Sequence, residues 1–191
     1  MGKVFKGAEM VNIVINASHT SYSPGAVWGE RNEHSDVLKF ARFLSFELER
    51  DPDINCIYHT GDCKSGYNDK DVVLILHRDS NCKNCNSYGC SITVQKNASA
   101  DIQYEAYRLL GSLGGDRGFR IKGVHTNTDK SPFKKMENTG TKHTFLIKLG
   151  FIDSWTDNKI FDTDFEFLAE KLAAELKEIF KGDTNEAYTA V

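Results

Sequence analysis

Largely apolar runs recur along the chain and predict buried β-strands. The longest occupy residues 11–17, 71–77 and 143–152, and shorter runs occupy residues 54–58 and 90–94. Continuous runs rich in valine, isoleucine and leucine are typical of strands with both faces buried, as in a parallel sheet. The run at residues 54–58 also suits a sheet edge. The pattern therefore predicts five strands spread over the length of the chain.

Three further segments carry apolar residues at helical spacing. The first follows Asn32, which suits the N-cap position, and Glu33, whose carboxylate the helix dipole favours in a first turn. The second covers residues 99–113 and the third covers residues 162–181. Strands that alternate with helices predict an α/β fold: a single domain with an open, twisted, mostly parallel sheet and helices on both faces.

The length of 191 residues suits one domain with a sizeable core. We expect residues 1–10 to be an N-terminal extension, residues 11–181 to be the domain, and residues 182–191 to be a C-terminal tail or linker. The net charge of −3 gives no general attraction to nucleic acid. No apolar run is long enough to span a bilayer, so we expect no membrane insertion.

The start of the chain lacks the apolar core of a secretory signal. Five cysteines, an odd number, argue against a complete disulfide framework, and we expect reduced thiols in the cytosol of the producing cell. The spacing of Cys82, Cys85 and Cys90 is also compatible with a structural zinc site. Either Cys63 or His77 would then be the fourth ligand, and a loop with free thiols is the alternative.

Two histidines end two of the predicted buried strands. His19 follows the first long run and His77 closes the second, while Glu33 opens the first helix. The carboxyl ends of parallel strands meet at one edge of the sheet, where ligands bind. Two imidazoles and one carboxylate with an open fourth position form a catalytic zinc shell. The sequence therefore predicts Zn²⁺ on these three side chains, with Glu30 as a rival for the carboxylate and solvent-exposed loop histidines as the structural alternative.

At these positions the chain resembles the zinc-dependent N-acetylmuramoyl-L-alanine amidases of the type-3 family, which includes bacterial autolysins and phage endolysins. The matching segments, in chain order, are residues 15–19, Asn32 with Glu33, residues 71–77, and residues 149–153 with Asp157. The resemblance implies that residues 11–181 are an amidase-like catalytic domain with zinc on the two histidines and Glu33. It also implies hydrolysis of the amide between N-acetylmuramic acid and L-alanine through a zinc-activated water.

Lys148 departs from the family pattern, because the family carries a catalytic glutamate at this register. An ammonium group cannot accept a proton from water unless its pKa falls far, but it can stabilise a developing oxyanion. Three interpretations follow: Lys148 is an inactivating change, another carboxylate such as Glu137 takes the role, or the activated water reacts with less help, about 10²–10⁴-fold more slowly. A strand-end lysine that reaches out to solvent is the structural alternative.

The resemblance thus leads us to expect a peptidoglycan hydrolase of the phage or prophage endolysin type. We expect it in the cytoplasm of the producing host cell, acting on the cell wall after release. Lys148 supports a second hypothesis, a catalytically weakened or inactive wall-binding module on the same fold. A third hypothesis is a zinc carboxypeptidase that acts on the stem peptide.

Overall fold

The computed structural model describes most of the chain. The described residues are 10–61, 67–68, 71–81, 87–127, 136 and 139–181. Several positions named above lie outside them: residues 1–9, Cys63, Cys82, Cys85, Glu137 and residues 182–191. The expected extension and tail, the cysteine zinc site and the role of Glu137 therefore stay predictions.

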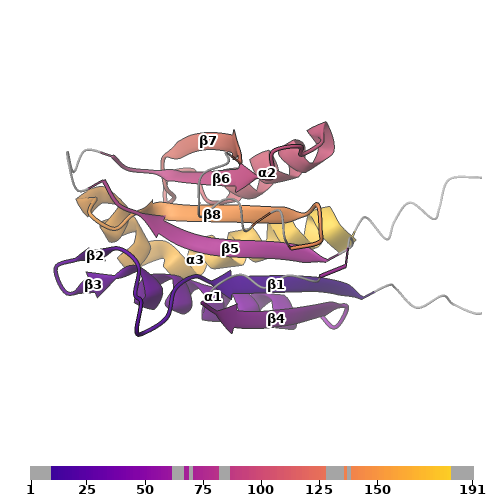
Figure 1. Cartoon of the computed structure of the whole chain (residues 1–191), viewed down its shortest axis with the longest axis horizontal. Coiled ribbons are helices and arrows are strands. Elements are labelled where there is room, and N and C mark those ends of the chain that lie inside the picture. Colours follow the sequence, from indigo (N-terminus) through magenta and orange to yellow (C-terminus); the bar gives the residue numbers. More distant parts are fainter. Residues whose placement is uncertain are drawn as a thin grey trace, which may run out of the picture.

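Six strands form one sheet in the spatial order β4-β1-β5-β8-β6-β7 (Figure 1). They are β1 (Val11–Ala17), β4 (Ile54–Thr60), β5 (Val72–Asp79), β6 (Cys90–Val94), β7 (Ile121–Thr126) and β8 (Thr144–Phe151). All neighbouring strands are parallel except β6 and β8, which are antiparallel. The α/β class, the mostly parallel sheet, the five predicted strands and the edge position of β4 are confirmed.

Three helices, α1 (Glu33–Glu49), α2 (Ala100–Ser112) and α3 (Trp155–Lys181), share one apolar core with alternate side chains of the sheet. All three therefore pack on the same face, and the prediction of helices on both faces is wrong for the described residues. A smaller cluster covers the other face, where Val14, Val73 and Leu146 pack with Met136 and Tyr67. Of the described residues, Tyr67 precedes β5 and Met136 precedes β8 in the chain, so both come from connections between strands.

Two predicted boundaries also change. Helix α3 begins at Trp155 rather than at residue 162, because Ser154 caps it: the Asp157 amide donates to Ser154 Oγ at 3.2 Å. Strand β7 is a sixth strand of the sheet and is absent from the five that the sequence predicted. Although α3 is 27 residues long, none of the described helices is both long and apolar enough to cross a membrane.

A short antiparallel hairpin of β2 (Val27–Trp28) and β3 (Arg31–Asn32) leads directly into α1. This connection brings the start of α1 back to the rim of the sheet, because the Glu33 amide donates to the Ala26 carbonyl at 2.9 Å. The rim also holds the carboxyl ends of β1 and β5, which are neighbours in register. The segments that carry His19, Glu33 and His77 thus meet at one edge of the molecule.

Candidate functional site

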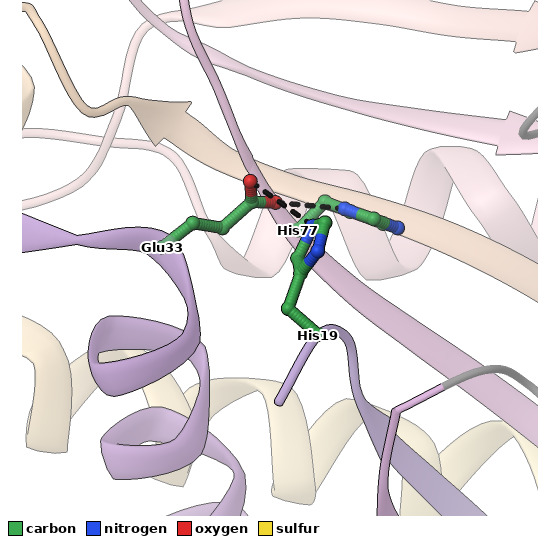
Figure 2. Close-up of side chains that lie close together, drawn as sticks. All are labelled: His19, Glu33 and His77. Atoms are coloured by element: carbon green, nitrogen blue, oxygen red, sulfur yellow. Dashed lines mark hydrogen bonds and ion pairs between the residues drawn. The ribbon is translucent and has the colours of Figure 1, made fainter. Parts of the chain in front are cut away.

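His19, Glu33 and His77 lie together, as the sequence predicts, although they come from three different elements (Figure 2). His19 Nε2 is 3.1 Å from Glu33 Oε2, and His77 Nδ1 is 2.7 Å from Glu33 Oε1. The two imidazole rings meet edge to face, with their centroids 5.1 Å apart. One potential ligand atom from each residue lies within 4.8 Å of the other two.

Backbone amides hold the Glu33 carboxylate in place. The Ala26 amide donates to Glu33 Oε2 and the Arg78 amide donates to Glu33 Oε1, both at 3.0 Å. The side chain of Asn32 accepts a hydrogen bond from the Ser35 amide at 2.9 Å, so Asn32 is the N-cap that the sequence predicts. Because the first helical residue is then Glu33, its carboxylate projects from a fixed helix start.

The electrostatics favour an ionised Glu33. Burial raises the pKa of this carboxyl, which is only 4% exposed, but hydrogen bonds from His19 and His77 and the charge of His77 outweigh that effect. The net result is a pKa well below its usual value. The site therefore presents a carboxylate anion, the form that a divalent cation requires.

A hydroxyl group orients the second imidazole. Ser18 Oγ lies 2.9 Å from His77 Nε2, while Nδ1 of the same ring faces Glu33. A polar partner on the remaining nitrogen is typical of metal-binding histidines, because it fixes the ring orientation. Ser18 was not predicted from the sequence, although its position next to His19, directly after β1, is a signal that points to it.

The donor set fits a zinc ion. Two imidazole nitrogens and a carboxylate oxygen suit this borderline cation, and the three groups converge from separate elements. Glu30 is exposed and does not belong to the group, so Glu33 is the carboxylate at this site. Within the described part of the chain no other group of this kind is found, and Cys90 is fully buried, with its pKa raised to about 12 by burial.

Lys148 lies beside this cluster but does not extend freely into solvent. It is the register partner of His77 on the neighbouring strand, and its Nζ donates to Asp79 Oδ2 at 2.6 Å. Asp79 stands two residues after His77 in β5, so both side chains are on the same face of the sheet. Asp79 was not predicted from the sequence, although this spacing pointed to it.

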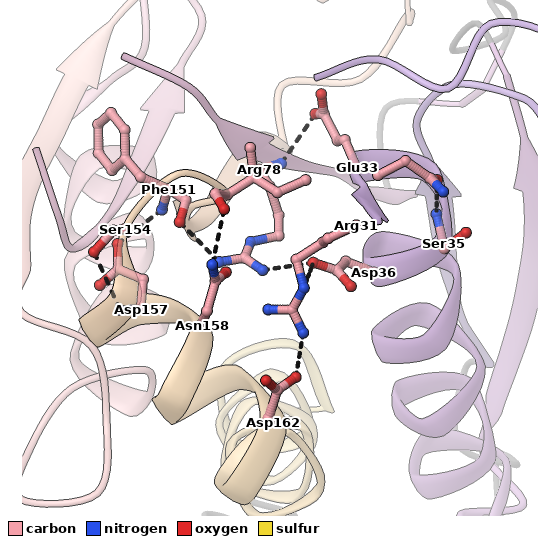
Figure 3. Close-up of polar contacts among 12 residues, drawn as sticks. Arg31, Glu33, Ser35, Asp36, Arg78, Phe151, Ser154, Asp157, Asn158 and Asp162 are labelled. Carbon is pink, nitrogen blue, oxygen red and sulfur yellow. Dashed lines mark hydrogen bonds and ion pairs between the residues drawn. The ribbon is translucent and has the colours of Figure 1, made fainter. Parts of the chain in front are cut away.

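A buried arginine links the site to the rest of the fold (Figure 3). Arg78 has a fully buried side chain that donates to Asp36 Oδ2 at 2.5 Å and to the Phe151 carbonyl at 3.0 Å. Its guanidinium also lies over the ring of Phe161, 4.8 Å from the centroid. Since the Arg78 amide holds Glu33, these contacts couple the carboxylate to α1, β8 and α3. Sequence reasoning missed this residue as well.

Comparison of the sequence with protein-family profiles and with curated proteins finds no match. Solved structures do match the fold. An N-acetylmuramoyl-L-alanine amidase from Clostridium difficile 630 superposes with a TM-score of 0.78 at 17% identity, covering 92% of this chain and 99% of that one. For the catalytic domain of the amidase CwlV from Bacillus (Paenibacillus) polymyxa var. colistinus, the TM-score is 0.72 at 20% identity, covering 88% and 97%.

The catalytic domain of the CD27L endolysin, which targets Clostridia difficile, gives a TM-score of 0.66 at 16% identity and covers 87% of this chain and 96% of that one. These matches confirm the resemblance at the level of the fold. Over 87% to 92% of its length, this chain has the fold of N-acetylmuramoyl-L-alanine amidase catalytic domains.

Proposed function

We propose that this chain is a peptidoglycan hydrolase that binds Zn²⁺ through His19, Glu33 and His77 and cleaves the amide between N-acetylmuramic acid and L-alanine. One observation carries the proposal: three ligand atoms within 4.8 Å of one another, on the fold of amidase catalytic domains. We further propose that it is a phage or prophage endolysin, made in the host cytoplasm and acting on the wall after release.

Each residue of the site has a separate role in the proposed reaction. Bound Zn²⁺ would supply a Lewis acid that activates water and polarises the scissile carbonyl. Glu33 contributes the negative charge that holds the cation, and the amides of Ala26 and Arg78 keep that carboxylate from turning away. Ser18 holds the ring of His77 in the ligating orientation.

Lys148 occupies the position where a general base is expected. In this proposal it does not act as a base and instead stabilises negative charge. Its ammonium lies at the rim next to His77, where positive charge stabilises a developing oxyanion. Asp79 fixes the ammonium through their 2.6 Å contact. We therefore expect slower hydrolysis than a site with a carboxylate base would give, by about 10²–10⁴-fold.

Metal analysis and product analysis test the proposal. We expect one zinc ion per wild-type chain and loss of zinc in His77→Ala. The matched control is His143→Ala, because His143 also contacts a carboxylate through Nδ1, that of Glu105 at 2.9 Å, but lies outside the cluster. Undiminished zinc in His77→Ala would remove this residue from the site.

Mass spectrometry of digested cell walls then identifies the bond. New L-alanine amino termini are expected from an amidase, whereas a carboxypeptidase would shorten the stem peptide and leave its amino terminus attached. If digestion releases no L-alanine amino termini, the amidase proposal fails.

Lys148, which stands beside His77 where a carboxylate base is expected, supports a second candidate, an inactive wall-binding module. Wall turbidity assays on wild type, Lys148→Gln and Lys148→Glu separate the two. If Lys148 assists hydrolysis, Lys148→Gln loses about 10²-fold in rate. If the chain is a binding module, wild type and Lys148→Gln bind walls without clearing them, and only Lys148→Glu gains activity.

A further inference from the structure

A cavity opens on the sheet face opposite the helices, next to the proposed metal site. Its volume is about 640 Å³, and side chains from β5, β6, β7 and β8 line it. Lys148, the register partner of His77, and Asp79 form its wall on the side of the histidine cluster. The cavity therefore extends from β5, the strand that carries His77, across β8 and β6 to β7.

The charge of the lining is positive. Lys122 and Lys148 contribute two ammonium groups, Asp79 contributes one carboxylate, and His125 adds an imidazole. Asp79 is already bound to Lys148. Lys122 has no ion-pair partner among the residues that the structure describes, and its Nζ lies over the ring of Phe151, 4.5 Å from the centroid. The lining thus carries an excess of positive charge at Lys122.

The rest of the lining suits a peptide. Phe151 and Val124 offer apolar surface, while the hydroxyls of Ser91, Thr93 and Thr126 offer hydrogen bonds. A cavity of this volume with an apolar wall and a few polar groups is typical of sites for small ligands. The chain as a whole has a net charge of −3, so the positive charge is local and does not favour long polyanions.

We propose that this cavity, the cationic cavity, binds a carboxylate of an acidic peptide through Lys122. The inference rests on the proposed function, because the peptide attached to the scissile amide would then enter the space beside His77. Lys148 and Asp79 form the border between the cavity and the histidine cluster. Lys122 is a specificity-determining residue in this assignment, and it selects a peptide with a free carboxylate over its amide.

Calorimetric titration of the full chain in the presence of a chelator tests the proposal, because hydrolysis of the probes is then prevented. The two probes are N-acetylmuramoyl-L-alanyl-D-glutamate and its D-isoglutamine amide, which differ by one carboxylate. We expect the acid to bind about fivefold more tightly than the amide, as a partly exposed ion pair would give. The preference should shrink as salt is added, because salt screens the interaction.

Lys122→Gln should abolish the preference for the acid and leave binding of the amide unchanged. Lys122 is exposed on an edge strand, so the variant is expected to fold, which circular dichroism verifies. Lys39→Gln is the matched control: Lys39 Nζ also lies over a ring, that of Phe165 at 3.8 Å, but it is on α1, away from the cavity. This control should retain the preference.

The outcomes separate this inference from the proposed hydrolase. Three results would overturn the carboxylate site, whether or not cell walls are digested. They are equal binding of the acid and the amide, binding of neither probe, and an unchanged preference in Lys122→Gln. Preferential binding of the acid without any wall digestion leaves the carboxylate site in place and rejects the hydrolase.

Discussion

His19 adopts a left-handed backbone conformation, with φ of 71°, which is uncommon for a residue other than glycine. Such strain is typical of functional sites, where the surrounding structure stabilises it. Gly25 lies against the same cluster: a Cβ built there would be 2.5 Å from Glu33 Oε2 and 2.7 Å from His19 Nε2. The absence of a side chain at Gly25 therefore leaves room for the two proposed metal ligands to approach each other.

Gly25→Ala should weaken zinc binding, because the new methyl group would displace Glu33 and His19. We expect a loss of about 10–100-fold in affinity, measured by competition with a chelator. Gly29→Ala is the control: Gly29 also has a positive φ, 60°, but a Cβ there meets nothing within 4 Å. The explanation would be wrong if both variants lost zinc affinity equally.

Cys90 provides a prediction that depends on pH. Burial raises the pKa of its thiol to about 12 in the folded chain, whereas an unfolded cysteine ionises near pH 8.5. The buried, neutral thiol therefore makes its full contribution to the free energy of unfolding below about pH 8.5. This contribution is lost as the pH rises toward 12. At pH 8.5, iodoacetamide should leave Cys90 unmodified in the folded protein and alkylate it in urea, as peptide mass mapping can show. Equal alkylation in both conditions would contradict the burial of this thiol.

At the scale of elements, the start of α1 determines where the carboxylate lies. Asn32 and Glu33 could be assigned from sequence, because an N-cap residue before a helical apolar pattern has a local signature. Strand β7 could not, because its side chains are exposed or half-buried and it contains Gly123. The start of α3 was hidden for a related reason: its first buried residue is Asp157, a carboxylate bound by the amides of Phe151 and Gly89.

Asn32→Ala should destabilise the fold by about 1 kcal/mol, because it leaves the Ser35 amide without its cap. Urea unfolding measures the change. Asn32→Asp is the matched control, since its carboxylate still accepts the hydrogen bond and also suits the helix dipole. A loss of stability in Asn32→Asp equal to that in Asn32→Ala would show that capping is not the cause.

At the scale of the whole molecule, Arg78 joins elements that no local pattern connects. Its partners Asp36 and Phe151 are 42 and 73 positions away in the chain (Figure 3). The order of hydrophobic runs along the chain predicted parallel strands. Because the carboxyl ends of such strands meet at one edge of the sheet, the same pattern predicted that His19, Glu33 and His77 lie together. The sequence did not reveal that the helices share one face, because that depends on where the connections between strands pass. For the same reason, Arg78 and Asp79 were not recognised as parts of the site.

Removal of the proposed zinc ion should leave the fold intact. Glu33 is held by two backbone amides as well as two imidazoles, and Ser18 holds His77, so these groups have protein partners of their own. We expect the far-ultraviolet circular dichroism spectrum to be unchanged by EDTA. The melting temperature should fall only by the amount that metal binding to the folded state had added to it. Unfolding on chelation, as in zinc fingers, would contradict this prediction.

The two amide hydrogen bonds to Glu33 thus have a practical consequence for handling the protein. If the proposed metal binds, a scaffold that keeps the three side chains in position can be produced and stored without the ion and loaded afterwards. The same polypeptide can then be compared with different divalent ions added, one at a time, to one and the same fold.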